Sequence, residues 1–228
     1  MSQHVPVVTI DGPSGTGKGT ITQLVAKHLG WHLLDSGALY RIVAIGIADL
    51  NILHNEISRI CDFASTMKVE FSTEFEGSIC LNGKEISHTV RLEETAEKAS
   101  QVAALGPLRE VLLERQRKFC QPPGLVADGR DMGTVVFPSA DLKIYLTASP
   151  EERAQRRYKQ LINKGVGVNL RGLLQDIASR DERDANRQVS PLRPAQDAVV
   201  IDTTALTIGQ VLESVLAQVS LALPEISK

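Results

Sequence analysis

The segment from Val7 to Leu29 constrains the fold more than any other part of the chain. It reads VVTIDGPSGTGKGTITQLVAKHL. The opening run VVTI is β-branched and largely apolar, which is typical of a buried parallel strand. After Lys18 the apolar residues have helical spacing, and Gly30 stands where a helix C-cap would fall. We therefore expect a strand and a helix joined by a glycine-rich loop.

The loop has the G-x-x-x-x-G-K spacing of a phosphate-binding loop, from Gly12 to Lys18. Its glycines let backbone N–H groups turn toward an anion without interference from a Cβ atom. The N-terminus of the following helix adds partial positive charge. Lys18 supplies a compact cation that can reach the β- and γ-phosphates of a nucleotide.

Two other interpretations of this segment are weaker. A turn that only connects two elements would not need strand, loop, lysine and helix in this order. A dinucleotide site would use Gly15, Gly17 and the later Asp35, but Thr20 stands at the third glycine position. Lys18 would also crowd the pyrophosphate. Because Gly19 follows the lysine, we expect no direct Ser/Thr ligand to magnesium at that position.

Composition excludes several classes. The 228 residues are 43% hydrophobic and 23% charged, as in globular proteins, and the net charge of -2 does not favour a nucleic-acid polymer or an anionic membrane. Cys61, Cys80 and Cys120 are far apart and odd in number, which argues against a metal or disulfide framework. With no leader-like segment and no long apolar run, we expect a cytoplasmic protein.

A second strand is expected at 32–34, with Ser36 as the N-cap of a helix over 38–47. Tyr40 and Arg41 fall in the first turns of this helix. In open α/β sheets ligands bind at the carboxyl edge, so this pair suits a second anion or a sugar hydroxyl. The alternative is an ordinary amphipathic helix start.

From about 49 to 89 the alternation of strands and helices stops. Residues 67–72 and 79–81 alternate with a period of two, Asn82-Gly83 is a strong hairpin signal, and 84–86 would be the returning strand. This pattern predicts a small antiparallel sheet inserted into the α/β domain. It contains no catalytic constellation, so we interpret it as a lid-like or substrate-side subdomain.

Two helices follow the insert, over 92–104 with Ser100 and over 108–119 with Arg109 in its first turn. A buried strand is then expected at 125–127.

Asp128 ends that strand, as a Walker-B-like carboxylate would for a water-mediated magnesium contact. Arg130 and Asp131 come next. They could form a structural salt bridge, but their place at a strand end favours substrate contact.

The last third of the chain is rich in arginine. After a strand at 142–146, Ser149-Pro150 starts a helix on which Arg153, Arg156 and Arg157 share one face. No acid follows within two turns, so we expect this cluster to be unpaired and to await an anion. A second helix carries a stripe of Arg180, Arg183, Asp184 and Arg187. A last strand at 198–201 and a helix capped by Thr207 complete the domain.

This arrangement fits phosphoryl transfer, in which the protein positions substrates and neutralises charge. A second anion-binding set (Arg41, Arg130 and Arg187) suggests an acceptor that is itself a phosphate.

Several stretches then resemble bacterial cytidylate kinases, which are P-loop kinases of the nucleoside-monophosphate kinase family. They are the loop GPSGTGKGT, DSGALYR at 35–41, SQVAALG at 100–106, ADGRDMGTVVFP at 127–138, ASPEERAQRR at 148–157 and RDERDANR at 180–187. The resemblance covers nearly the whole chain.

It implies a single domain whose core is a parallel-sheet P-loop NTPase fold flanked by helices (about 1–36, 104–150 and 190–228). It also implies an NMP-binding region with a small antiparallel β insert (about 37–103) and a helical lid (about 151–189).

The implied reaction is phosphoryl transfer from ATP to CMP or dCMP, with magnesium, in pyrimidine nucleotide metabolism. The resemblance assigns the ATP phosphates to Gly12, Pro13, Ser14, Gly15, Thr16, Gly17, Lys18, Gly19 and Thr20. It assigns catalysis to Lys18, Asp128, Arg153 and Arg157, with the last two in the lid. It assigns CMP to Ser36, Tyr40, Arg41, Ser100, Arg109, Arg130, Asp131, Arg180, Asp184 and Arg187.

Within the CMP set, three arginines (41, 130 and 187) would hold the phosphate. Tyr40, Arg180 and Asp184 would meet the ribose, and Ser100, Arg109 and Asp131 the cytosine. Magnesium would be held through water near Thr20 and Asp128, with no direct protein ligand. We expect a monomer.

Two alternatives remain. A kinase of another small metabolite, such as shikimate, would share the loop but would not need a cytosine-reading set. A nucleotide-dependent switch or binding module should carry an N-K-x-D motif, and its nearest match, Asn82-Gly-Lys-Glu, falls in the expected hairpin.

Overall fold

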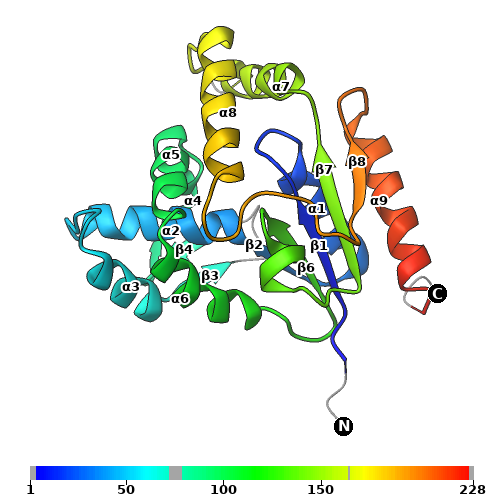
Figure 1. Cartoon of the computed structure of the whole chain (residues 1–228), viewed down its shortest axis with the longest axis horizontal. Coiled ribbons are helices and arrows are strands. Elements are labelled where there is room, and N and C mark those ends of the chain that lie inside the picture. The colour runs from blue at the N-terminus through cyan, green and yellow to red at the C-terminus, as the bar shows by residue number, and fades with distance from the viewer. Residues whose placement is uncertain (1–3, 72–78, 164, 226–228) are drawn as a thin grey trace. The chain divides into compact units, whose positions relative to one another are not determined.

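The computed structural model describes residues 4–71, 79–163 and 165–225. The chain forms two compact units (Figure 1). Unit 1 comprises Met1–Asp35 and Arg117–Lys228, and unit 2 comprises Ser36–Gln116. In the described ranges, no helix is both long enough and apolar enough to cross a membrane.

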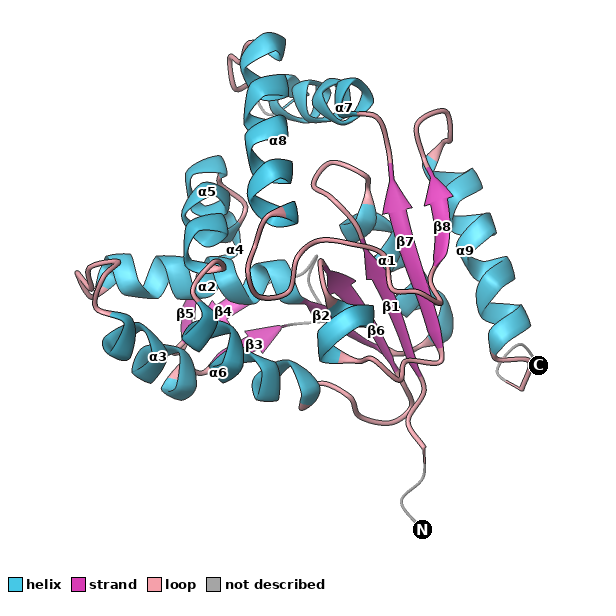
Figure 2. Ribbon diagram, in the orientation of Figure 1, coloured by secondary structure: helices cyan, strands magenta, loops and turns pink. Residues whose placement is uncertain are grey.

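Unit 1 is built on a five-stranded parallel sheet in the order β2-β6-β1-β7-β8 (Figure 2). The strands are β1 (Val7–Asp11), β2 (His32–Asp35), β6 (Leu125–Gly129), β7 (Leu142–Thr147) and β8 (Val199–Asp202). All five were expected from the sequence. In the register, Asp11 lies opposite Gly129 and Asp35 lies opposite Asp128. The carboxyl ends of these strands therefore meet at one edge, where polar side chains gather.

The helices of unit 1 are α1 (Lys18–Leu29), α7 (Pro150–Asn163), α8 (Leu170–Ala185) and α9 (Ile208–Ala222), with a short π-helix η1 (Met132–Val136). The expected caps of α1 and α9 are confirmed. Gly30 ends α1 with φ 67°, and Thr207 forms a capping box with Gln210 at the start of α9. The π-helix was not predicted, because its sequence carries no period that distinguishes it from a loop.

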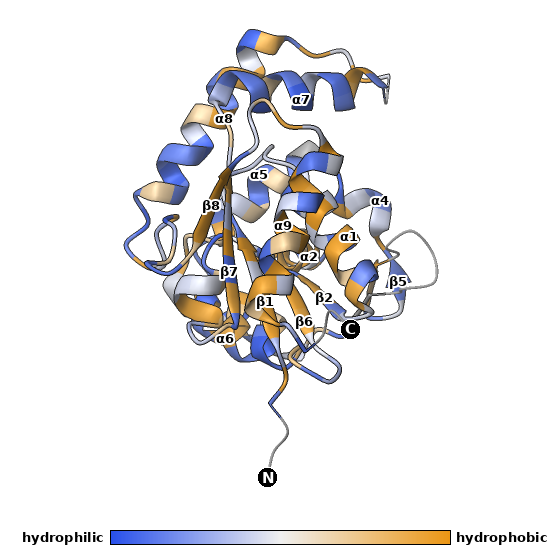
Figure 3. Cartoon of the chain, turned by 90° about the vertical axis from the view of Figure 1, so that its right-hand side faces the viewer, coloured by the Kyte–Doolittle hydropathy of each residue, from blue (hydrophilic) through white to orange (hydrophobic). Residues whose placement is uncertain are grey.

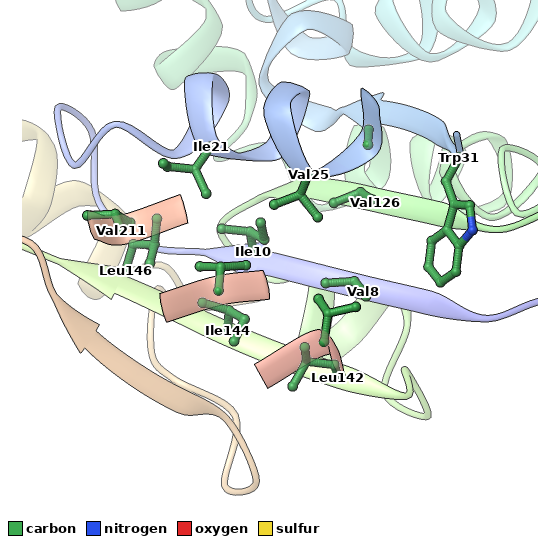
Figure 4. Close-up of a cluster of buried hydrophobic side chains, with 13 residues drawn as sticks. Val8, Ile10, Ile21, Val25, Trp31, Val126, Leu142, Ile144, Leu146 and Val211 are labelled. Carbon is green, nitrogen blue, oxygen red and sulfur yellow. The ribbon is translucent and has the colours of Figure 1, made fainter. Parts of the chain in front are cut away.

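The core of unit 1 lies between the sheet and helices α1 and α9. Val8 and Ile10 of β1 and Ile144 and Leu146 of β7 contact a cluster that also includes Val25 of α1 (Figure 4). The strands are hydrophobic along their length, whereas α7 is mostly hydrophilic (Figure 3). Each fully buried aliphatic side chain contributes roughly 1.5–3 kcal/mol. The helix that follows the phosphate loop is thus anchored by its apolar face.

Unit 2 contains α2 (Ser36–Asp49), α3 (Ile57–Thr66), α4 (Ser87–Val90), α5 (Glu93–Val102), α6 (Gly106–Arg117, whose last residue falls in unit 1) and a three-stranded antiparallel sheet. The strands are β3 (Val69–Phe71), β4 (Ile79–Leu81) and β5 (Lys84–Glu85). Asn82 (φ 50°) and Gly83 (φ 82°) form the two-residue turn between β4 and β5. The antiparallel insert and its hairpin are confirmed. Ser72, which we included in the alternating run, lies outside the described residues.

Some helix predictions in unit 2 were wrong. Helices α3 and α4 were missed: Ile57, Ile60 and Ala64 of α3 have helical spacing, but the segment was interpreted only as part of an antiparallel insert. Helix α2 begins at Ser36 itself, so Ser36 is not the residue before the helix. Helix α6 begins at Gly106, two residues before the expected start, because Pro107 is tolerated in a first turn.

Candidate functional site

The phosphate loop lies tightly against strand β7 and against helix α7, which follows β7 in the chain. A Cβ atom on Gly12 (φ 144°) would lie 2.0 Å from the carbonyl oxygen of Leu146. A Cβ atom on Gly15 (φ 82°) would lie 3.0 Å from Cβ of Arg153. Both positions therefore require glycine, for space and for backbone conformation. Gly17 (φ 88°) is the left-handed residue from which α1 starts.

Lys18 lies at the start of α1 with only 6% of its surface exposed. Its Nζ atom donates to the carbonyl oxygen of Pro13 at 2.8 Å, and Thr16 Oγ1 donates to the same oxygen at 3.1 Å. Burial, followed by the charge of Arg130, lowers the pKa of Lys18 to about 7, although Asp128 opposes the shift. The loop thus holds a cation whose charge is unfavourable until an anion arrives.

Three buried carboxylates stand at or just beyond the carboxyl edge of the sheet: Asp11, Asp128 and Asp131. The Oδ2 atom of Asp128 lies 3.5 Å from where a Cβ atom on Gly19 would be, so this carboxylate is beside the first turn of α1. Asp11 accepts hydrogen bonds from the backbone N–H groups of Met132 at 2.9 Å and Gly133 at 2.8 Å. Burial raises the pKa of Asp11 to about 7 despite these two donors.

Asp184 is shared by two arginines that the sequence analysis assigned to the CMP phosphate. Arg130 Nε donates to its Oδ2 atom at 2.9 Å, and Arg187 Nη2 donates to Oδ1. Burial alone would raise the pKa of Asp184, but Arg130, Arg187 and Arg180 outweigh it and hold the pKa below its ordinary value. Arg187 lies beyond the end of α8, after the C-cap residue Asn186. The Asp184 carboxylate therefore holds the guanidinium groups of Arg130 and Arg187 close to each other.

The prediction that the arginines of α7 are unpaired was wrong. Arg153 is 3% exposed and forms a bidentate ion pair with Asp181 of α8, at 2.5 and 3.0 Å. Arg156 pairs with Glu152 at 2.9 Å. The acids come from another helix and from the preceding turn of the same helix, and neither lies within the two turns that follow the arginines. Arg157 donates to Gln160 at 3.3 Å.

Two of these arginines also contact the phosphate loop. Arg153 Nη1 donates to the carbonyl oxygen of Ser14 at 3.2 Å, and Arg156 Nη1 reaches that of Thr16 at 3.4 Å. Arg156 further donates to the side chain and backbone of Thr203, at 3.0 and 2.5 Å. The sequence analysis gave Arg156 no role in the site. Its place on the same helical face as Arg153 was the only signal for this contact.

Five predicted site residues belong to unit 2. Arg109 and Tyr40 are both buried, and the guanidinium carbon lies 5.5 Å from the centre of the Tyr40 ring. Arg109 Nη1 also donates to the carbonyl oxygen of Ala103 at 3.1 Å. Ser36 donates to Gln116 Oε1 at 2.6 Å, and Arg41 is half-buried.

Ser100 of α5 is 5% exposed. Among the residues that the structure describes, its Oγ atom has no hydrogen-bond partner. A buried hydroxyl without a partner costs free energy, so it marks a place where a bound molecule would supply the missing hydrogen bond.

The donors near α1 fit a magnesium ion that keeps most of its waters. Within the described ranges, no group of three or more His, Cys, Asp or Glu side chains could hold a metal ion. Asp128 provides an oxygen donor beside Gly19, and the exposed Thr20 follows Gly19 in the chain. Magnesium prefers such hard oxygen donors and is commonly bound through one or two of them together with substrate phosphates.

Comparisons with known proteins place the chain among kinases. The family model described as cytidylate kinase matches residues 8–221. A cytidylate kinase from Aeromonas hydrophila is 52% identical over 228 residues, covering 100% of this chain and 99% of that protein. One from Shewanella loihica is 53% identical over 229 residues, covering 99% of each, and one from a Marinomonas species is 54% identical over 224 residues, covering 97% of this chain and 99% of that protein.

Among solved structures, a gluconokinase from Sinorhizobium meliloti aligns with a TM-score of 0.47 and 15% identity, over 97% of this chain and 95% of that one.

Proposed function

Because the chain belongs to the cytidylate kinase family and transfers a phosphoryl group from ATP to CMP or dCMP, we propose a division of this work among its residues. Unit 1 holds the phosphates of ATP and the phosphate of CMP. The cytosine base draws its contacts from Ser100 and Arg109 of unit 2 and from Asp131. The observation that carries this proposal is that unit 1 contains two separate cationic sites. One is the buried lysine of the phosphate loop, and the other is the group of arginines around Asp184.

In this proposal the ATP phosphates bind the residues from Gly12 to Thr20. Lys18 leaves the carbonyl oxygen of Pro13 and donates to the β- and γ-phosphates, whose charge restores the full protonation of its amine. Asp128 and Thr20 would hold magnesium through water. When bound, the ion neutralises charge on the β- and γ-oxygens. Arg153 and Arg157 of α7 belong to the lid over ATP and offset charge that develops on the transferred group.

The CMP phosphate binds Arg41, Arg130 and Arg187. Asp184 keeps two of these guanidinium groups oriented before the phosphate arrives, so less side-chain freedom is lost on binding. Asp184, Arg180 and Tyr40 also contact the ribose hydroxyls. Ser36 is the remaining residue of the CMP site. Each phosphate oxygen replaces contacts that guanidinium groups otherwise make with water or protein.

The base is selected by donor and acceptor matching. Cytosine donates from its 4-amino group and accepts at N3, whereas uracil accepts at O4 and donates at N3. A carboxylate only accepts, so Asp131 suits the amino group, and a guanidinium only donates, so Arg109 suits N3. Ser100 can do either, and its buried Oγ atom gains a hydrogen bond from the base. A site with buried groups that the wrong ligand leaves unpaired can reject it by about 10⁴-fold.

ADP release measured with CMP, dCMP, UMP, AMP and shikimate as acceptors tests the reaction. We expect turnover with CMP and dCMP, and a preference for shikimate would overturn the proposal.

Asp131→Asn tests the base contact. The amide can turn its NH₂ group toward O4 of uracil, so we expect activity with CMP to fall and the CMP:UMP ratio of kcat/KM to drop at least roughly tenfold. An unchanged ratio in a folded variant would show that Asp131 does not contact the base.

We further propose that 37–103 is the NMP-binding region, that 151–189 is the lid and that the remainder is the core. We also propose that the enzyme is a monomer and that it works in the cytoplasm, where ATP and nucleotides are found. Sedimentation of the full chain at assay concentration tests the oligomeric state, and a stable dimer would contradict it.

A further inference from the structure

A buried aspartate outside the substrate-contacting set connects the phosphate-loop strand to the turn that carries Arg130 and Asp131. Asp11 is the last residue of β1 and immediately precedes Gly12. Its side chain reaches across to the turn after the neighbouring strand β6, and Asp11 is only 5% exposed. Its two oxygens each accept one backbone N–H group, from Met132 and from Gly133, at 2.9 and 2.8 Å.

These donors are the first N–H groups of the π-helix η1, which starts at Met132. Groups at a helix start have no partner within the helix and need one from elsewhere. Asp131, the N-cap residue of η1, supplies no side-chain hydrogen bond to cap it. Asp11 satisfies these two donors instead, from another strand.

We propose that Asp11 is a positioning residue for CMP: it fixes the turn from which Arg130 and Asp131 project. The inference rests on the proposed function, which assigns the phosphate to Arg130 and the base to Asp131. Two hydrogen bonds to adjacent backbone groups fix both the position and the orientation of that turn. Side chains must be held within a fraction of an ångström to bind productively, and a misplacement of about 1 Å can cost 10²-fold.

The turn at Gly133 has little room to move relative to the sheet. A Cβ atom on Gly133 would lie 2.9 Å from Thr9 Oγ1 and 3.2 Å from Lys143 Cδ, so the turn rests directly on the sheet. The Asp11 carboxylate spans the short gap that remains. An asparagine has one acceptor and one NH₂ group, and it would therefore place a donor against one of the two N–H groups.

The test compares Asp11→Asn with Asp141→Asn. Asp141 is a matched control, because its Oδ2 atom accepts the backbone N–H of Val7 at 2.8 Å, at the opposite end of the same strand β1. Both variants lose a carboxylate bound to backbone, so both should lower the melting temperature. We expect only Asp11→Asn to raise KM for CMP, by roughly tenfold or more, while KM for ATP changes less than twofold.

A second variant approaches the same contact from the turn. Gly133→Ala should push its N–H group away from Asp11 and raise KM for CMP in the same way. It serves in place of Asp11→Asn if that variant does not fold. Asp11→Asn should also lower the CMP:UMP ratio of kcat/KM, which a purely structural loss would leave unchanged.

The variant Arg130→Lys distinguishes a failure of the proposed phosphate contact from a failure of the positioning role of Asp11. If Arg130→Lys leaves KM for CMP unchanged, the assignment of Arg130 to the phosphate fails. If Arg130→Lys raises KM for CMP but the folded Asp11→Asn and Gly133→Ala variants do not, the positioning role of Asp11 fails alone. Equal increases in KM for ATP and CMP in Asp11→Asn would also overturn it, because they would indicate general damage to the edge of the sheet.

Discussion

Replacing the lysine of the phosphate loop by methionine should stabilise the free protein while abolishing its activity. Lys18 is buried, and its charge is opposed by burial and by Arg130. Methionine has a similar length, no charge and a flexible shape, so it can occupy the same space. The carbonyl oxygen of Pro13 loses the hydrogen bond from Lys18 but still accepts one from the hydroxyl of Thr16 at 3.1 Å.

The pKa of Lys18 gives the expected change in the free energy of unfolding. A fall from 10.5 to about 7 means that keeping the folded protein's lysine charged costs on the order of 5 kcal/mol below pH 7. The lost hydrogen bond to Pro13 offsets about 1 kcal/mol of that gain. We expect a net stabilisation of up to roughly 4 kcal/mol at pH 6, which would raise Tm by about 2–4 °C per kcal/mol in a chain of this size.

The sign of the pH dependence follows from the direction of the shift. Below pH 7 the wild-type protein carries the whole cost, because Lys18 is charged in both states. As pH rises from about 7 toward 10.5, the folded protein releases this proton before the unfolded chain does, and the wild type gains stability. The advantage of Lys18→Met should therefore be largest at pH 6 and should shrink by pH 9.

Urea unfolding between pH 6 and 9, without nucleotides, measures this difference. Lys143→Met is the matched control, since Lys143 is also buried but donates to Asp197 at 2.8 Å and to the carbonyl oxygen of Pro138 at 2.6 Å. Its replacement leaves that carbonyl unsatisfied and should destabilise. A Lys18→Met protein less stable than wild type at pH 6, or an advantage that does not change with pH, would refute the reasoning.

Two further outcomes concern ligand binding. Binding of MgATP at pH 7 should take up about half a proton, because Lys18 with a pKa of about 7 becomes fully charged beside the phosphates; calorimetry in buffers of different ionisation enthalpy should detect this, and Lys18→Arg should remove it. Helix α7 should gain strong protection from hydrogen exchange only when ATP and CMP mimics are bound together, and equal protection in the free enzyme would argue against a lid.

The parallel sheet was predictable because each strand is a short apolar run bounded by turn signals. The same holds for the hairpin of the insert, where Asn82-Gly83 requires left-handed backbone that few other pairs adopt. Helix α3 was missed although Ile57, Ile60 and Ala64 have helical spacing, and its position depends on packing against α2. There, Gly46 leaves room for the ring of Phe63, which would lie 2.0 Å from a Cβ atom.

The candidate site was predictable in its residue types but not in its pairings. Spacing along α7 placed three arginines on one face, yet the partner of Arg153 is Asp181, which is 28 residues away on α8. Asp11 gave no signal beyond its place before Gly12, since its role depends on a π-helix more than a hundred residues later. Long-range pairing of charges depends on tertiary structure, which local periodicity does not encode.

The position of the single tryptophan makes unit 1 visible to spectroscopy on its own. Trp31 is 9% exposed and packs on Gly124, where a Cβ atom would lie 2.4 Å from the indole ring (Figure 4). Indole emission therefore reports the integrity of this part of the β2–β6 layer, while unit 2 contributes no indole chromophore. Emission and far-ultraviolet circular dichroism followed side by side would resolve whether the two units melt together. Unit 1 thus carries an intrinsic fluorophore that unit 2 lacks.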